Sequence, residues 1–368
     1  SGWAVSLSDD GNRVAIGATR NNGNGYESGH VRVYEYSIGG WTQLGSDIDG
    51  EASSNVSGFS VSLSDNGNRV AIGARDNDGN GTDAGHVRVY DYSSGSWTQL
   101  GSDFDGEAAG DHCGFSVSLS DNGNRVAIGA PRNDGNGSMS GHVRVYEYSI
   151  GGWTQLGSDI DGEASSDGSG WSVSLSDNGN RVAIGTPYND GNGWQSGHVR
   201  VYDYSGGSWT QLGSDIDGEA ATANSGWAVS LSDDGNRVAI GAPYISQAPS
   251  GPKSGHVRIY DYSGGSWTQL GSDIDGEAAG DRSGKSVSLS GDGTILAIGA
   301  TRNNGNGTYS GHVRIYDYSS GSWTQLGSDI DGEASGDYSG WSVSLSDDGG
   351  AVAVGTPYNN GNGFYSGH

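Results

Sequence analysis

Cysteine, lysine and long apolar runs are scarce in this sequence, and each scarcity excludes a class of protein. Cys113 is the only cysteine, so the chain forms no internal disulfide and no site with several thiolate ligands. No run of about 18 apolar residues occurs, which predicts no membrane insertion. Lys253 and Lys285 are the only lysines, and the formal net charge is −26. Because an acidic surface repels phosphate backbones, we expect no nucleic-acid partner.

What the chain has in abundance is an internal repeat. The stretch 58–74 recurs, with an aromatic residue at positions 3, 59, 115, 171, 227 and 341 and Lys285 at the remaining place. Most steps are 56 residues (59−3) and one is 58 (285−227). Such a period predicts a repeat architecture, and the copies starting near 1, 57, 113, 169, 225, 283 and 339 predict one domain over 1–368. Because Ser1 opens inside a repeat, we expect the chain to be processed or an excerpt.

Each repeat contains four segments with the alternation of β-strands. In the copy 57–112 they are 59–64 (strand a), 69–74 (b), 86–92 (c) and 97 to about 104 (d). Asn66-Gly67 between a and b is a strong hairpin signal, and no segment has helical periodicity. The sequence therefore predicts an all-β, seven-bladed β-propeller of four-stranded antiparallel blades, about 56 residues per repeat. A β-solenoid is the alternative, although its repeats are usually shorter and its strands parallel.

The last repeat is shorter than the others. Strands a and b occur seven times, whereas strands c and d occur six times. We therefore expect an incomplete last blade that lacks strands c and d. Its missing strands are expected from another chain, by edge addition, or from a continuation of the array.

Three segments of each copy carry a family resemblance. In the third copy they are Gly-Phe-Ser-Val-Ser (114–118), Ala-Ile-Gly-Ala-Pro (127–131) and Gly-His-Val-Arg-Val-Tyr (141–146). These segments resemble the FG-GAP repeat of integrin α-subunits and, more weakly, WD repeats. The resemblance implies an extracellular or cell-surface propeller for adhesion or scaffolding, often stabilised by calcium. The family's calcium loop joins strands a and b, where this chain has only the tight turn 121–124.

Two acidic segments are candidates for binding a hard cation such as Ca²⁺, the one cofactor predicted. The run 47–51 and its copies place three carboxylates within five residues, and the loop between strands b and c adds another acid. The alternative is that these residues only form solvated, capped turns. The candidate ligands are Asp47, Asp49, Glu51, Asp103, Asp105, Glu107, Asp134 and Asp190.

Two further sets of polar residues repeat. A histidine opens every strand c, and we expect it to form a hydrogen bond to the neighbouring loop, because equivalent histidines around a ring cannot share one metal. Asn-X-Ser/Thr sequons predict a glycoprotein if the protein is secreted by a eukaryote. The histidines are 30, 86, 142, 198, 256, 312 and 368, and the sequons begin at Asn55, Asn80, Asn136 and Asn306.

The copies differ mainly in the b–c and d–a loops, which lie on one face of an up-and-down blade. Exposed Tyr, Trp and Arg are typical of binding hot spots, whereas relaxed drift of unconstrained loops is the alternative. Residues 58–74, by contrast, are interpreted as scaffold. The predicted ligand-binding face consists of Arg20, Tyr26, Arg132, Tyr188, Trp194, Tyr244, Arg302, Tyr309 and Tyr358.

These features predict a non-enzymatic extracellular propeller that acts in adhesion or structural assembly, with protein or glycan partners on a cell surface or matrix. The alternative is a lectin-like carbohydrate-binding propeller that uses the same aromatic residues. An enzyme needs one asymmetric set of catalytic groups. Here the acidic run is copied around the ring, and the one irregular loop, 244–254, contains no acid. We therefore predict that the chain is not an enzyme.

Overall fold

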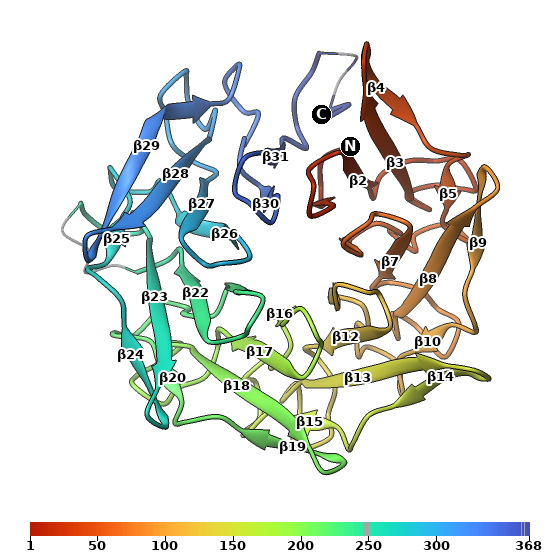
Figure 1. Cartoon of the computed structure of the whole chain (residues 1–368), viewed down its shortest axis with the longest axis horizontal. Helices are drawn as coiled ribbons and strands as arrows, with labels where there is room; N and C mark the ends of the chain where they lie inside the picture. Colours follow the sequence, from red (N-terminus) through yellow and green to blue (C-terminus); the bar gives the residue numbers. More distant parts are fainter. Residues whose placement is uncertain (246–249, 362, 364) are drawn as a thin grey trace.

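The computed structural model describes residues 1–245, 250–361, 363 and 365–368, so part of the irregular loop 244–254 lies outside the described residues. Antiparallel sheets follow one another around a central axis, and the two termini lie side by side (Figure 1). The predicted all-β propeller with antiparallel blades is confirmed. In the described part of the chain, no helix is long and apolar enough to cross a membrane.

The two inner strands of each sheet come from the most regular part of the repeat. Strand a is β1 (Val5–Leu7), β6 (Ser60–Leu63), β11 (Ser116–Leu119), β16 (Ser172–Leu175), β21 (Ala228–Leu231), β26 (Ser283–Leu289) and β30 (Ser342–Leu345). Strand b is β2 (Arg13–Ala18), β7 (Arg69–Ala74), β12 (Arg125–Ala130), β17 (Arg181–Thr186), β22 (Arg237–Ala242), β27 (Ile295–Ala300) and β31 (Val352–Gly355).

The outer strands follow the same order, and the predicted strand d is divided in five of the sheets into two pieces that both pair with strand c. Strand c is β3 (His30–Ser37), β8 (His86–Ser93), β13 (His142–Ser149), β18 (His198–Ser205), β23 (His256–Ser263) and β28 (His312–Ser319). Strand d is β4 (Gly40–Gln43) with β5 (Ile48–Asp49), β9 (Ser96–Gln99) with β10 (Phe104–Asp105), β14 (Gly152–Gln155) with β15 (Ile160–Asp161), β19 (Ser208–Gln211) with β20 (Ile216–Asp217), β24 (Ser266–Gln269) with β25 (Ile274–Asp275), and β29 (Ser322–Asp331).

The number of blades differs from the prediction. Six sheets of four or five strands are present in the described residues, and β30 with β31 forms a sheet of only two strands. The prediction of seven blades is therefore wrong, because the chain holds only six copies of strands c and d. The lost cover is visible on β29, where Leu326 is 46% and Ile330 is 40% exposed, whereas the equivalent Ile160 is 5% exposed. The supply of the missing strands by another chain or by a continuation stays a prediction.

Two closed circles of hydrogen bonds join the inner strands. At the a–b turns, the backbone N–H of each turn donates to the carbonyl of the next, at 2.8–3.0 Å, from Asp9 round to Asp347 and back to Asp9. On strand a, a serine Oγ accepts the backbone N–H of a leucine in the next sheet, for example Ser118 Oγ from Leu175 N at 3.0 Å. The last of these bonds, from Leu7 N to Ser344 Oγ, closes the circle between the two ends of the chain.

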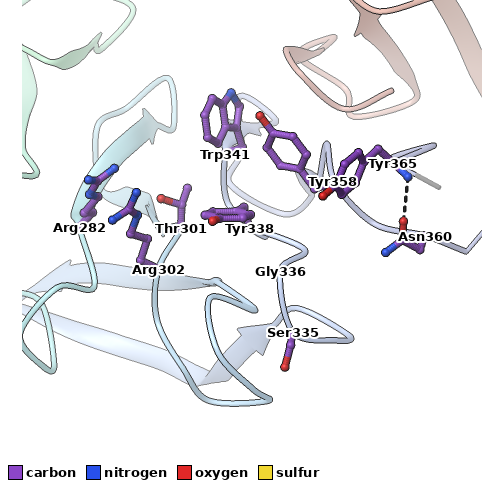
Figure 2. A pocket seen from close by; sticks show the side chains of 10 residues that line it. All are labelled: Arg282, Thr301, Arg302, Ser335, Gly336, Tyr338, Trp341, Tyr358, Asn360 and Tyr365. Atoms are coloured by element: carbon purple, nitrogen blue, oxygen red, sulfur yellow. Dashed lines mark hydrogen bonds between the residues drawn. The ribbon is translucent and has the colours of Figure 1, made fainter.

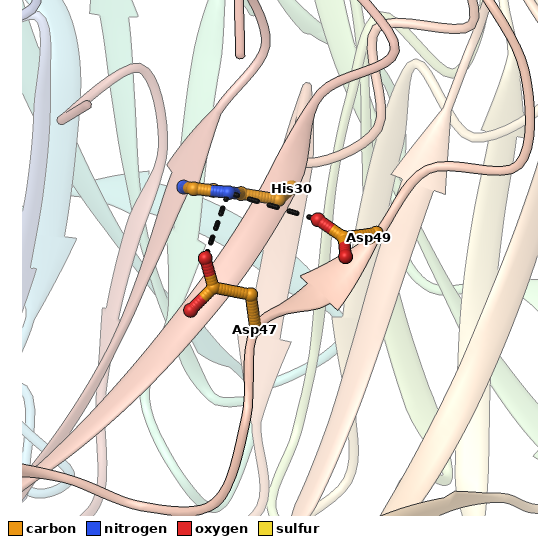
Figure 3. Close-up of side chains that lie close together, drawn as sticks. All are labelled: His30, Asp47 and Asp49. Carbon is orange, nitrogen blue, oxygen red and sulfur yellow. Dashed lines mark ion pairs between the residues drawn. The ribbon is translucent and has the colours of Figure 1, made fainter. Parts of the chain in front are cut away.

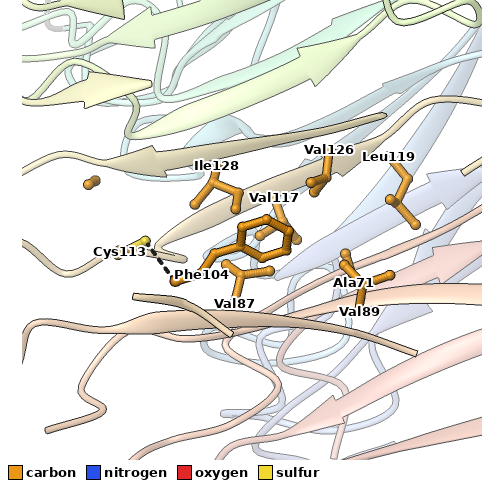
Figure 4. Packing of buried hydrophobic residues seen from close by; sticks show 10 residues of the cluster. Ala71, Val87, Val89, Phe104, Cys113, Val117, Leu119, Val126 and Ile128 are labelled. Carbon is orange, nitrogen blue, oxygen red and sulfur yellow. Dashed lines mark hydrogen bonds between the residues drawn. The ribbon is translucent and has the colours of Figure 1, made fainter. Parts of the chain in front are cut away.

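The apolar core lies between neighbouring sheets. Figure 4 shows one such layer, in which Val87 and Phe104 of β8 and β10 pack against Val117 and Ile128 of the next sheet. Small side chains on one sheet, such as Ala71, admit Val and Leu of its neighbour. Cys113 is fully buried in this layer, and burial raises the pKa of its thiol to about 11, so it packs as an apolar side chain.

Replacement of one serine of the second circle tests its contribution to stability. We expect Ser118→Ala to lower the free energy of unfolding by about 1–3 kcal/mol, because the backbone N–H of Leu175 loses its acceptor in a half-buried position. Chemical denaturation followed by tryptophan fluorescence measures the change. Ser102→Ala, at an exposed loop position, is the control and should leave stability unchanged. Equal stability of both variants would contradict a stabilising role for the circle.

Candidate functional site

A belt of aromatic rings surrounds the axis at the start of the innermost strands. Centroids of neighbouring rings are 4.4–5.7 Å apart, which is the range of favourable tilted and edge contacts. The belt lines a cavity of about 520 Å³. From the sequence this position was interpreted as scaffold alone, although one aromatic residue recurs in almost every repeat. The aromatic belt consists of Trp3, Phe59, Phe115, Trp171, Trp227, Trp341 and, in the place of a seventh ring, Lys285.

Lys285 gives the aromatic belt its one amino group. Its Nζ lies 4.6 Å from the ring centroid of Trp227 and 4.9 Å from that of Trp341. These contacts favour the protonated form, since indole faces attract cations. Burial, followed by the Arg282 guanidinium, lowers the pKa of Lys285 to about 7. The aromatic belt therefore contains an amino group that titrates near neutral pH.

The predicted ligand-binding face divides into an inner and an outer group. The b–c and d–a loops do lie side by side, because in the described residues a parallel bridge such as Gly85 to Cys113 joins them in six places. The inner group packs on the aromatic belt with centroid distances of 5.0–5.9 Å and consists of Tyr188, Tyr244 and Tyr358. The outer group is exposed by 39–67% and consists of Tyr26, Trp194 and Tyr309.

The predicted arginines of this face lie against other side chains. Arg20 stands over the ring of Tyr358 at 5.9 Å, and Arg302 over that of Tyr309 at 5.1 Å. Arg132 instead contacts a histidine, as described below. The arginines of the face are therefore in contact with a ring or a histidine, whereas Tyr26 and Trp194 are exposed.

A cavity of about 530 Å³ opens beside the aromatic belt, next to the two-stranded sheet (Figure 2). Two guanidinium groups lie on one side of it, and aromatic rings follow on the other. Burial lowers the pKa of Arg282. We call this cavity the Arg–aromatic pocket, and its defining side chains are Arg282, Arg302, Tyr338, Trp341, Tyr358 and Tyr365.

One cluster of polar side chains occurs once among the repeats. His112 Nδ1 lies 3.0 Å from Asp76 Oδ1, and its Nε2 lies 2.9 Å from Arg132 Nη1. Burial acts to raise the pKa of Asp76, but His112 and Arg75 together hold it below its ordinary value. Arg75 also stands over the Phe59 ring at 4.0 Å, which links the cluster to the aromatic belt. The chain thus contains an asymmetric constellation, which the sequence analysis did not identify.

The structure divides each predicted acidic run between two sheets. Asp47 Oδ2 and Asp49 Oδ1 lie 3.3 and 3.9 Å from His30 Nδ1 (Figure 3). Glu51 turns to the next sheet, where its Oε2 lies 3.8 Å from His86 Nδ1. The run therefore contributes to two clusters, and each cluster includes a histidine that the prediction had assigned only a structural role. Asp103 and Glu107 repeat this division, while Asp105 is exposed and contributes its backbone carbonyl to Arg144.

Six of the strand-c histidines, 30, 86, 142, 198, 256 and 312, are buried at the junction of two sheets, whereas His368 is exposed. Burial, followed by Arg88, lowers the pKa of His86 to about 4, so this imidazole is neutral at pH 7. In the described residues, Nδ1 of His86 and Nδ1 of His312 have no hydrogen-bond partner. The expected hydrogen bond to the neighbouring loop is thus missing at Nδ1 of these two histidines.

The remaining candidate oxygens serve the local turns. Asp134 Oδ1 and Asp190 Oδ1 accept backbone N–H groups of their own loops at 2.8 and 2.7 Å. In the a–b turn, Asn122 Oδ1 accepts the N–H of Asn124 at 2.8 Å and the hydroxyl of Ser120 at 3.1 Å. Because this tight turn uses its side-chain oxygen internally, it does not fit the calcium loop that the family resemblance implies.

The four sequon asparagines differ in exposure. Asn55 is 3% exposed, so its amide is buried. The other three are exposed, but each donates from Nδ2 to a backbone carbonyl of the neighbouring loop: Asn80 to Gly106 at 2.7 Å, Asn136 to Gly162 at 2.9 Å and Asn306 to Gly332 at 3.1 Å. Glycosylation stays a prediction.

At the a–b end of the axis, six aspartates gather where the first hydrogen-bond circle closes. Burial and hydrogen bonding to Asp121 raise the pKa of Asp9 to about 8, and burial and Asp347 raise that of Asp233 to about 7. Gly291 takes the seventh place, and the carboxylates of Asp233 and Asp347 lean over it. The ring of aspartates consists of Asp9, Asp65, Asp121, Asp177, Asp233 and Asp347.

Comparison with known families supports the resemblance in two places. The FG-GAP repeat model matches residues 105–146 and 274–316. These segments begin near the end of strand d and run through strands a, b and c of the third and sixth repeats. The chain is therefore a β-propeller with FG-GAP repeats at these two positions. No curated protein matches the sequence.

Solved structures share the fold at low sequence identity. A putative 6-phosphogluconolactonase from Bacteroides uniformis has a TM-score of 0.62 and 14% identity, over 96% of this chain and 88% of that one. Hydrazine synthase from Kuenenia stuttgartiensis has a TM-score of 0.61 and 13% identity, over 96% and 94%. The periplasmic gluconolactonase of Pseudomonas aeruginosa has a TM-score of 0.59 and 15% identity, over 90% and 85%.

These neighbours correct one prediction. From the sequence we predicted that the chain is not an enzyme, because its repeats leave no asymmetric site. Proteins named as lactonases have the same fold, and the Asp76–His112–Arg132 cluster breaks the repeat symmetry. The prediction is therefore overturned, and repeated sequence does not by itself exclude catalysis. The extracellular location, the adhesive role and calcium binding stay predictions.

The ring of aspartates predicts a pH dependence of stability. A carboxyl whose pKa is raised by folding holds its proton more tightly in the folded chain, so stability falls as pH rises from about 4 to about 7 at Asp233. We expect Asp233→Asn to be more stable than the wild type at pH 8, with the difference vanishing below pH 4, in thermal melts across this range. Asp83→Asn removes the same charge far from the ring of aspartates. Its melting temperature should therefore depend on pH as that of the wild type does. If the melting temperatures of the wild type and Asp233→Asn changed in parallel with pH, the raised pKa of Asp233 would be contradicted.

Proposed function

We propose that this propeller binds an acidic carbohydrate on the face formed by the b–c and d–a loops, with the Arg–aromatic pocket as the site. The observation that carries the proposal is a pair of guanidinium groups without carboxylate partners. In the described residues, no carboxylate lies within ion-pair distance of Arg282 or Arg302. In a chain with a net charge of −26, such a pair favours an anionic ligand.

Most other arginines of the chain, by contrast, have carboxylate partners. Arg13, Arg69 and Arg125 pair with acids of their own sheets at 2.6–2.9 Å. Arg88 and Arg144 pair with glutamates of the preceding sheet at 3.4 Å. These pairs stabilise the scaffold and are not available to a ligand. In the described residues Arg132 has no carboxylate partner either, but it contacts His112, which leaves the two arginines of the pocket for recognition.

The rings of the pocket suit a sugar. Tyr358 contacts Trp341, Tyr338 and Tyr365 with centroid distances of 5.9, 5.3 and 5.5 Å, so the rings form a continuous apolar wall. Aromatic faces pack against the C–H surface of a sugar ring, and a guanidinium binds a carboxylate through two parallel hydrogen bonds. A volume of about 530 Å³ is within the usual range of ligand sites, about 300–1,000 Å³.

The biological setting is part of the same proposal. An acidic polysaccharide on a cell surface or in a matrix presents many copies of one ligand. A propeller that binds it at the cell exterior would act in adhesion or in assembly, as the family resemblance implies. The exposed outer group of Tyr26, Trp194 and Tyr309 supports contacts beyond one pocket.

Calorimetric titration of the protein with uronic-acid oligosaccharides tests the proposal. We expect Arg302→Gln to weaken binding by about tenfold or more, because a charge-assisted hydrogen bond contributes about 1.5–3 kcal/mol. Neutral oligosaccharides of the same length should bind the wild type more weakly, and added salt should reduce the difference.

Arg132→Gln is the matched control, because Arg132 holds the same repeat position but does not line the pocket. It should bind like the wild type. Equal binding by Arg302→Gln, or equal affinity for neutral and acidic oligosaccharides, would overturn the proposal.

Hydrolysis of a sugar lactone is a second candidate function. The Asp76–His112–Arg132 cluster supports it, together with the fold shared with proteins named as gluconolactonases. Asp76 would orient His112 through Nδ1, and Arg132 would move from His112 Nε2 to the negative charge that develops on the lactone oxygen, which frees Nε2 as a general base for water.

A rate measurement with glucono-δ-lactone tests this candidate. We expect hydrolysis above the spontaneous rate and a loss of at least about tenfold in Asp76→Asn, because the imidazole loses its orienting carboxylate. Arg302→Gln, outside the cluster, should keep the rate. A wild-type rate equal to the spontaneous rate would reject the candidate.

A further inference from the structure

A cluster of three metal-ligand types recurs where one sheet meets the next. It combines the glutamate of the preceding acidic run, the histidine that opens strand c and the first aspartate of the following acidic run. In the second sheet, His86 Nδ1 lies 3.8 Å from Glu51 Oε2 and 3.5 Å from Asp103 Oδ2. All three donor atoms lie within 4.8 Å of one another.

Each carboxylate in this cluster is oriented by a contact to its other oxygen. Gln99 Nε2 donates to Asp103 Oδ1 at 2.6 Å, and Arg88 Nη1 donates to Glu51 Oε1 at 3.4 Å. The other two oxygens, Asp103 Oδ2 and Glu51 Oε2, face the imidazole, and Glu51 Oε2 also accepts a long hydrogen bond of 3.5 Å from Asn77 Nδ2. This arrangement is that of metal sites, in which outer hydrogen bonds hold one oxygen and direct the other at the ion.

The histidine supplies the observation that points to a ligand. His86 is 1% exposed, and its Nδ1 has no hydrogen-bond partner in the described residues. Its distances to the carboxylates exceed those of a hydrogen bond, about 2.7–3.2 Å. Three donors at about 2.1 Å from one tetrahedral ion are themselves about 3.4 Å apart. The observed separations of 3.5 and 3.8 Å are close to that value.

The same atoms are placed alike in other sheets. His312 Nδ1 is also without a hydrogen-bond partner and lies 3.3 Å from Asp329 Oδ2 and 3.9 Å from Glu277 Oε2. The other corresponding clusters are Glu107 with His142 and Asp159, and Glu163 with His198 and Asp215.

The clusters at His30 and His256 differ from the other clusters in their arginine contacts. At His30 no glutamate arrives from a preceding sheet, and Arg32 instead holds both oxygens of Asp47 at 2.9 and 2.8 Å. Around His256, Arg258 contacts both Glu219 and Asp273. Arg258 thus bridges two carboxylates, whereas Arg88 and Arg144 contact only the glutamate of their junctions.

We propose that each junction of Glu, His and Asp without such a bridging arginine binds one divalent transition-metal ion. The ion joins neighbouring sheets through Glu51, His86 and Asp103 and their counterparts. Two carboxylates and a neutral imidazole favour the zinc class, since calcium prefers a full shell of oxygens. Its charge offsets the carboxylates in a strongly acidic chain, and a fourth position is left for water.

Metal counting on the intact chain tests this inference. The protein is stripped with EDTA, loaded with Zn²⁺ or Co²⁺, dialysed and measured by elemental analysis. We expect about four bound ions per chain, a Co²⁺ absorption typical of low coordination number, and a raised melting temperature. Glu107→Gln, at an exposed side chain, should lower the count by one ion without loss of the fold.

Glu333→Gln is the matched control. Glu333 has the same repeat position and the same contact to an asparagine, Asn359, but in the described residues no histidine lies within ion-pair distance, so the metal count should stay unchanged. No ion retained by the wild type, or an equal loss in both variants, would overturn the inference. Retention of Ca²⁺ in place of Zn²⁺ or Co²⁺ would also overturn it and favour the oxygen-only site predicted from the acidic runs.

Discussion

The closed circle of hydrogen bonds between the a–b turns is the constraint on which the rest of this structure depends. Seven turns donate to one another in sequence, from Asp9 to Asp347 and back, so the inner strands surround the axis completely. The two-stranded sheet is enough for this closure, because the circle uses only strands a and b. The outer strands can therefore be missing at one place without opening the ring at its axis.

Closure concentrates chemically different groups at the two ends of the axis. Repeat symmetry brings one side chain per copy together, which places aspartates at one end and aromatic rings at the other. Where one copy has a different residue at such a position, that residue is surrounded by the equivalent side chains of the neighbouring copies. Lys285 lies between two tryptophans for this reason, and Gly291 leaves space for two carboxylates.

Junctions between sheets add a second kind of site. The acidic run looks like a unit in the sequence, yet its aspartate and its glutamate belong to different junctions because the chain crosses from one sheet to the next within it. A pocket of arginines and rings lies beside the incomplete sheet, and an asymmetric cluster lies around His112. Nearly identical copies thus produce several distinct environments.

The sequence by itself determined the repeat length, the order of strands in each copy and the all-β propeller, since period and alternation are local properties. It also showed that strands c and d occur six times, although the number of blades was overestimated. Only the tertiary structure decided which side chains meet. Trp3 and Trp341 are neighbours through ring closure, and Glu51 reaches His86 across a junction. Contacts between copies depend on the angle and register between sheets, and no pattern within one copy encodes these.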